Sequence, residues 1–198
     1  MRLSWNEISS LAVVCILALL VLHKWLNNEE RNLVCTISGV DGEKYCVRDR
    51  ARLQDAADLL AETSIRMDRV VEFCSNTDPE NEAVARLKSR YSSGEIKETL
   101  PTSEYTAYSE NKGEKMAFCV NVRRNGERLI DQNTLTFVAL HELGHVMSVS
   151  VGHTEEFWDN FKYLVDKAVE CGVYVPVDYR KEPATYCGME LTHNPYFT

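Results

Sequence analysis

The sequence lacks clusters of basic residues. No block of five or more Lys and Arg occurs, and 30 acidic residues outnumber 22 basic ones, which gives a formal net charge of −8. Proteins that bind a phosphate backbone depend mainly on clustered Lys and Arg. We therefore do not expect nucleic acid as a direct partner.

Internal repeats and low-complexity tracts are also absent, which excludes a repeat protein and a long disordered chain. The 198 residues, of which 44% are hydrophobic and 26% charged, have the composition of an ordinary globular protein. They are enough for one well-packed domain and too few for two large ones.

Charge is missing from residues 8–22. Trp5 and Trp25 bracket this run, and at about 1.5 Å per residue their separation matches the roughly 30 Å bilayer core with an aromatic residue at each interface. We therefore expect a single transmembrane anchor over residues 1–26, with a membrane location for the protein. A cleaved signal peptide and a buried core helix are the alternatives, although the residues that follow offer no small-residue cleavage site. Basic residues are balanced across the run, so the side of the soluble part stays undetermined.

No two cysteines have the CxxC spacing, which argues against a cysteine zinc ribbon. Of the seven cysteines, Cys15 lies in the apolar run and six follow it. An even set behind a membrane segment suggests disulfides, and buried free thiols in a cytosolic domain are the alternative. We expect a Cys35–Cys46 disulfide, because residues 27–50 contain two short strands joined by an Asp41-Gly42 turn.

Residues 51–198 are expected to form the main domain. Apolar residues recur at helical spacing in four segments, and these predict helices at 52–74, 80–91, 133–148 and 155–171. We expect Asn133 or Thr134 to cap the third helix, and Thr154 to cap the fourth, which Gly172 ends. Residues 115–124 predict a strand, residues 92–101 a loop, and the tail from residue 173 an ordered loop over the domain.

The third of these helices carries the motif HELGH. His141 and His145 are one helical turn apart, the spacing that lets two imidazoles reach the same Zn²⁺. Glu142 is then turned to one side, where it can act as a general base on a metal-activated water without binding the metal. A chance HExxH in a buried helix is the alternative, but buried polar groups need partners, and a metal supplies one.

A catalytic zinc site needs a third protein ligand and leaves a fourth position open. His153 is the leading candidate, because Gly152 permits a tight turn and Thr154 caps the next helix. Glu170 is the second candidate. The spacing differs from the metzincin pattern HExxHxxGxxH, and Trp158 with Phe157 is expected in the core.

The stretch VALHELGHVMSVSVGHTEEFWDNFKYL, residues 138–164, resembles the WLM and SprT-like zincin group, in which an HExxH helix precedes a short loop, a third histidine and an aromatic residue. The segments YCVRDR, NKGEKMAFCV and YCGMELTHNPY are similar to uncharacterised membrane-anchored zincin-like proteins of large DNA viruses of algae and amoebae. The first resemblance implies a small α+β zincin-like domain, with His141, His145 and His153 as zinc ligands and Glu142 as the base. It implies no substrate, and the role of some relatives in degrading DNA-crosslinked proteins does not suit an acidic chain with a membrane segment.

The sequence therefore predicts a membrane-anchored zinc peptidase that acts on protein or peptide substrates. A donor for the developing oxyanion is also needed, and the tail offers the candidates Tyr179, Tyr186 and His193. The alternatives are a membrane-anchored structural or interaction protein in which zinc only stabilises the fold, and a binding module with a degenerate peptidase scaffold. Glu142 separates them, because a purely structural site needs no carboxylate there.

Overall fold

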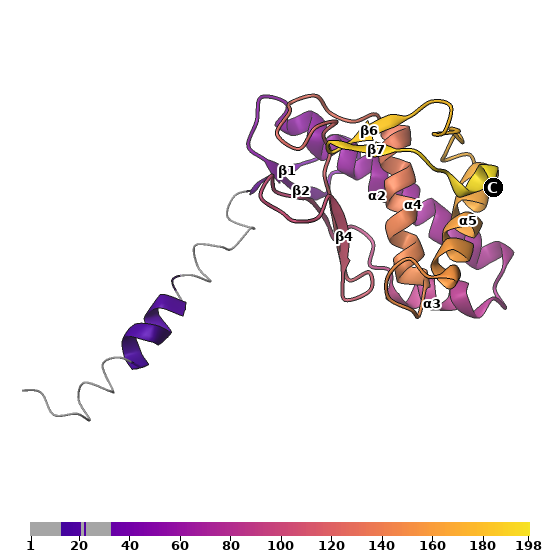
Figure 1. Ribbon diagram of the computed structural model, residues 1–198, viewed down its shortest axis with the longest axis horizontal. Helices are drawn as coiled ribbons and strands as arrows, with labels where there is room; N and C mark the ends of the chain where they lie inside the picture. Colours follow the sequence, from indigo (N-terminus) through magenta and orange to yellow (C-terminus); the bar gives the residue numbers. More distant parts are fainter. Residues whose placement is uncertain (1–12, 21, 23–32) are drawn as a thin grey trace, which may run out of the picture.

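The computed structural model describes residues 13–20, 22 and 33–198 of the chain (Figure 1). Their central element is a mixed sheet with the strand order β1-β2-β3-β5-β4. Its strands are β1 (Leu33–Ile37), β2 (Lys44–Arg48), β3 (Ile96–Glu98), β4 (Ala107–Glu110) and β5 (Lys115–Phe118). β3 pairs in parallel with both β2 and β5, whereas β1 and β4 pair antiparallel with their neighbours and form the two edges.

Four long or medium helices accompany the sheet: α2 (Leu53–Thr77), α3 (Glu82–Arg90), α4 (Gln132–Met147) and α5 (Glu155–Glu170). The tail adds a small hairpin, β6 (Ala184–Tyr186) with β7 (Met189–Leu191), and a 3₁₀ turn, η2 (Pro195–Phe197). These elements confirm the predicted α+β class.

Helix α4 lies among the other helices and contacts α2, α3, α5 and β4, as Figure 1 shows. Most of its side chains are buried, in agreement with its apolar sequence. A helix that is apolar on nearly all sides must be surrounded by other elements. The HELGH motif therefore stands on the most enclosed helix of the described structure.

Helix ends follow from capping residues. Thr154 caps α5 as predicted, by accepting a hydrogen bond from the Phe157 N–H, and Gly172 follows the helix with φ +74°. The predicted cap of α4 was wrong, because Asp131 takes that place. Its carboxylate accepts hydrogen bonds from the N–H and the hydroxyl of Thr134, at 2.9 and 2.7 Å.

Two strands were not predicted from the sequence. β3 falls inside residues 92–101, which were expected to be loop, and β4 was not expected at all. The strand predicted at 115–124 is shorter, and ends at Phe118. β3 has only three residues and is stabilised by parallel partners far away in the sequence, so its local pattern carries little signal.

The hairpin of residues 33–48 is part of the same sheet, because Cys46 in β2 is paired with Lys97 in β3. The sheet thus contains strands from both sides of residue 50, where the hairpin segment was expected to end and the main domain to begin. Cys35 and Cys46 are directly opposite each other in the β1–β2 register and form a disulfide.

The tail is held to the domain by a second disulfide, between Cys119 and Cys187. Two further hydrogen bonds join it to the segment after β5, from the Cys187 N–H to the Asn121 carbonyl and from the Gly188 N–H to the Val122 carbonyl. The tail is therefore ordered, as expected, and it contains short strands that its sequence did not predict.

Most of the expected anchor, residues 1–12, 21 and 23–26, lies outside the described residues. Residues 13–20 and 22 are helical, and their apolar side chains are exposed. Among the residues that the structure describes, none of the helices combines the length and the apolar character that a bilayer crossing requires.

Candidate metal centre

Three histidines from two different segments converge at one place. His141 and His145 occupy successive turns of α4, and His153 lies in the loop of residues 148–154 that leads to α5. The Nε2 atoms of His141 and His153 are 3.0 Å apart, and one ring nitrogen from each histidine lies within 4.8 Å of the other two. The three side chains form a group that could hold a metal ion.

The spacing suits a small ion. Two nitrogens at about 2.0–2.1 Å from one Zn²⁺ in tetrahedral geometry lie about 3.4 Å apart, within the range that these histidines span. Burial lowers the pKa of His141 to about 3 and that of His145 to about 4, and the neighbouring histidines add to both shifts. Both rings are therefore neutral near pH 7, the form in which imidazole binds a metal.

Phe157 forms the floor beneath the histidines. Its fully buried ring has centroid distances of 4.8 Å to His141, 4.3 Å to His145 and 4.7 Å to His153. The ring of His145 stacks on it, while the other two meet it edge to face. One side chain of α5 thus contacts all three candidate ligands.

Glu142 follows His141 in α4 and is only 6% exposed. Burial raises its pKa to about 7. Within the described part of the chain, no residue donates a hydrogen bond to its carboxylate or forms an ion pair with it. A buried carboxylate with a pKa of about 7, beside three convergent imidazoles, has the properties of a candidate general base.

Glu170, the second candidate for the third ligand, stands at the last residue of α5. Its side chain is 57% exposed and pairs with Lys167 at 3.3 Å. Among the described residues it does not belong to the group that could hold a metal. His153 alone of the two candidates joins His141 and His145.

Two of the candidate oxyanion donors, Tyr186 and Tyr179, are buried among other residues of the domain. The Tyr186 hydroxyl donates to the Thr106 carbonyl at 3.0 Å and accepts from the Cys119 N–H at 3.1 Å, so it links the tail to the strands. Tyr179 is buried against Phe137, with ring centroids 4.9 Å apart.

His193 and His153 share a neighbour, because each ring lies 5.9 Å from the Trp158 ring. Trp158 was expected in the core and is instead 40% exposed, so that prediction was wrong. The residue projects from the side of α5 where His153 and His193 lie, whereas Phe157 points into the core. An exposed tryptophan therefore stands at the rim of the histidine group.

The edge of the sheet lies next to this site. β4 contacts α4 and pairs only with β5 among the described strands, so it forms one edge of the sheet. The strand that the sequence predicted at residues 115–124, β5, lies inside the sheet between β3 and β4.

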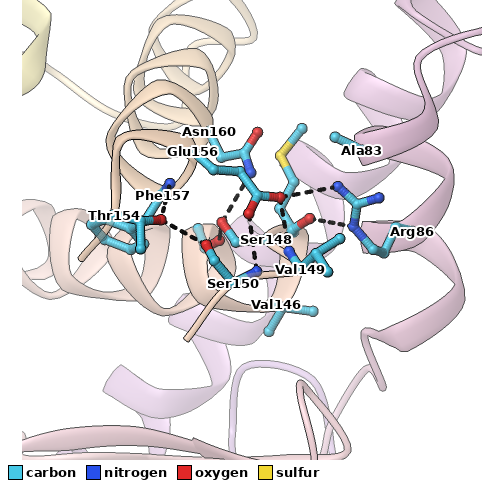
Figure 2. Close-up of polar contacts among 12 residues, drawn as sticks. Ala83, Arg86, Val146, Ser148, Val149, Ser150, Thr154, Glu156, Phe157 and Asn160 are labelled. Atoms are coloured by element: carbon cyan, nitrogen blue, oxygen red, sulfur yellow. Dashed lines mark hydrogen bonds and ion pairs between the residues drawn. The ribbon is translucent and has the colours of Figure 1, made fainter. Parts of the chain in front are cut away.

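The loop that carries His153 is surrounded by side chains that the sequence did not single out. Four side chains bond to its backbone or to the end of α4: Glu156, Arg86, Arg90 and Lys112. Figure 2 shows two of them, Glu156 and Arg86. Glu156 is expected at the first turn of α5 for its favourable interaction with the helix dipole. Its hydrogen bonds to the loop backbone depend on the path of the preceding loop, which no local pattern reveals.

No family model and no solved structure matches this chain. An uncharacterised protein of Acanthamoeba polyphaga mimivirus is 26% identical over 184 residues, which cover 90% of this chain and 93% of that protein. An uncharacterised protein of Invertebrate iridescent virus 6 is 36% identical over 69 residues, 34% of this chain and 38% of that protein. One of Invertebrate iridescent virus 3 is 46% identical over 50 residues, 25% of this chain and 31% of that protein. The homologues are thus proteins of large DNA viruses, as one of the two resemblances suggested.

Proposed function

We propose that this chain is a zinc-dependent peptidase that hydrolyses peptide bonds in protein or peptide substrates. His141, His145 and His153 hold the ion in this proposal, and Glu142 is the general base. The observation that supports it best is that the group, in the part of the chain that the structure describes, leaves a fourth coordination position without a protein ligand. The group comprises three histidines, and no fourth His, Cys, Asp or Glu joins it among the described residues. Structural zinc sites are closed by four protein ligands, whereas catalytic sites keep one position open.

The chemistry divides between the ion and the chain. A bound Zn²⁺ supplies Lewis acidity, which activates a water molecule near neutral pH and polarises a peptide carbonyl. The Glu142 carboxylate takes the proton of the attacking water and later passes it to the nitrogen of the departing amine. His193 is the donor that we favour for the developing oxyanion, because it is exposed and its ring and that of His153 each lie 5.9 Å from the Trp158 ring.

Strand β4 is the proposed substrate platform. It is an edge strand of the sheet, and an extended peptide added beside it would be held by main-chain hydrogen bonds, which do not demand a particular side chain. This mode of binding favours an unfolded or extended segment of a protein over a folded surface.

We also propose that the apolar run of residues 8–22 anchors the protein in a membrane. The exposed apolar side chains at residues 13–20 and 22 support this, since water is a poor environment for such a surface. Alkaline extraction of membranes from cells that make the full chain tests the anchor. Release of the protein into the soluble fraction would contradict it.

The peptidase is tested by the variant Glu142→Gln, which keeps the shape of the side chain and removes its basicity. We expect the full chain, purified in detergent, to bind one Zn²⁺ and to cleave members of a random peptide library. The variant should keep its zinc and lose cleavage by at least about a hundredfold. Zinc binding without cleavage in the wild type would favour the alternative, a site that only stabilises the fold.

A further inference from the structure

The loop of residues 148–150 has no regular secondary structure, yet its backbone is bonded throughout. The Glu156 carboxylate accepts hydrogen bonds from the N–H groups of Val149 at 2.8 Å and Ser150 at 2.9 Å (Figure 2). The Ser148 N–H donates to the Gly144 carbonyl at 3.1 Å, which continues the last turn of α4. Every N–H of this segment therefore has an acceptor, and two of the three depend on one side chain.

The carbonyl groups of the same segment face a cation. Lys112 Nζ donates to the carbonyls of Ser148, Val149 and Ser150, at 3.2, 3.4 and 2.9 Å. Lys112 lies in the tight turn between β4 and β5, with φ +60°. The loop after the HELGH helix is thus held from one side by Glu156 of α5 and from the other by the hairpin that carries the edge strand.

The position of Glu156 is fixed in turn by its own neighbours. Arg86 of α3 lies 3.5 Å from its carboxylate and also donates to the Met147 carbonyl at 2.7 Å. Asn160, one turn further along α5, donates to the Ser148 hydroxyl at 2.9 Å. Figure 2 shows these groups around the loop. The carboxylate is therefore not a mobile surface charge.

His153 lies inside the short span that these contacts define. Before it, Ser150 is held by Glu156, and after it, Thr154 caps α5. The Ser150 and Thr154 hydroxyls are 2.6 Å apart and form a hydrogen bond across the two ends of this span. Between them only Val151, Gly152 and His153 remain, and Gly152 has φ +83°. His153 is itself exposed, and its ring meets the Phe157 ring only edge to face, so the path of the loop also sets its position.

We propose that Glu156 is a positioning residue for the third ligand: by holding the backbone of residues 149–150, it keeps His153 within reach of the ion bound by His141 and His145. The inference rests on the proposed metal centre. Groups that orient metal ligands affect affinity strongly, and their removal costs about tenfold to a hundredfold in metal binding. Glu156 would act through the backbone instead of through a hydrogen bond to the imidazole.

The experiment measures the affinity of the full chain for Zn²⁺ alone, by competition with a chromophoric chelator. Glu156→Gln should weaken zinc binding about tenfold or more. Glu155→Gln is the matched control, because it removes the same charge from the same turn of α5, and the exposed Glu155 side chain has no hydrogen bond or ion pair among the described residues. That control should bind zinc like the wild type. Lys112→Met removes the hydrogen bonds to the loop carbonyls from the other side and should also weaken zinc binding.

A double-mutant cycle separates positioning from general destabilisation. In a His153→Ala background the third ligand is already absent, so Glu156→Gln should cause no further loss beyond about twofold. An equal loss in both backgrounds would overturn the proposal, and so would unchanged affinity of Glu156→Gln in the wild-type background. In either case tight zinc binding by the wild type would leave the metal centre standing. A wild type that binds no zinc would overturn the metal centre and this inference together.

Discussion

Gly144 packs so closely against Phe157 that a Cβ added to the glycine would lie 3.1 Å from Cε2 of the phenylalanine ring. The same added atom would lie 3.4 Å from Cβ of Phe161. Gly144 is the glycine of the HELGH motif, and Phe157 contacts all three histidines. The absent side chain therefore lets α5 approach α4 closely enough for one aromatic ring to support the whole histidine group.

We predict that Gly144→Ala weakens zinc binding about tenfold with little change in thermal stability. Alanine in a helix interior gains about 1 kcal/mol over glycine. The added Cβ at 3.1 Å requires only a small shift of its neighbour, which places the crowding cost at the low end of about 1–3 kcal/mol, so the two effects nearly cancel. Displacement of the Phe157 ring is not offset and shifts the histidines. Chelator competition measures the affinity and thermal denaturation the stability. An affinity equal to that of the wild type would show that Phe157 does not set the geometry.

A contrasting glycine gives the control. Gly113 has φ +111°, and a Cβ there would lie 2.8 Å from Cγ1 of Val146. It lies outside any helix, so alanine brings no gain in helix propensity. Gly113→Ala should therefore lower the melting temperature clearly, whereas Gly144→Ala should not.

The sequence predicted the histidine group better than the residues around it. His141, Glu142 and His145 are set by the period of one helix, which a local pattern contains. The position of His153 depends on side chains from α3, from α5 and from the β4–β5 turn, and these contacts are long-range. β3 as a strand and the Cys119–Cys187 disulfide were missed for the same reason, since each depends on residues far away in the sequence. The Asp131 cap was missed although its partner Thr134 is only three residues away, so a local pattern contained it.

The loop of residues 148–154 should respond to acid through Glu156. Hydrogen bonds from Ser150 and Val149 lower the pKa of Glu156 from 4.5 to about 2. Because the folded pKa lies below the unfolded one, the stabilisation is fully present above pH 4.5 and is lost as the pH falls towards 2. We expect the difference in melting temperature between wild type and Glu156→Gln to be constant from pH 5 to 7 and to shrink below about pH 4. A difference that did not change with pH would contradict this account.

The two disulfides should contribute unequally to stability. Cys119 and Cys187 are separated by 68 residues, and Cys35 and Cys46 by 11. The loss of unfolded-chain entropy grows with the closed loop, to about 4 kcal/mol for the longer and about 3 kcal/mol for the shorter one. Pairwise replacement by alanine should lower the free energy of unfolding more for the Cys119 pair, as measured by chemical denaturation. A larger effect at Cys35 and Cys46 would mean that native packing, and not loop closure, dominates.

Glu98 should be the most sensitive carboxylate of the sheet. Its side chain is fully buried in β3, where it accepts a hydrogen bond from the Arg48 N–H at 2.8 Å and pairs with the guanidinium groups of Arg48, at 3.0 Å, and Arg50. Glu98→Gln leaves these two arginines buried beside a neutral group, and removal of one partner from a buried pair costs about 3–5 kcal/mol. Glu110→Gln is the matched control, because Glu110 is 42% exposed and lies 3.6 Å from Lys97. An exposed pair contributes about 0–1 kcal/mol, so the control should unfold at nearly the wild-type denaturant concentration. Equal losses in the two variants would show that the burial of Glu98 does not decide its contribution.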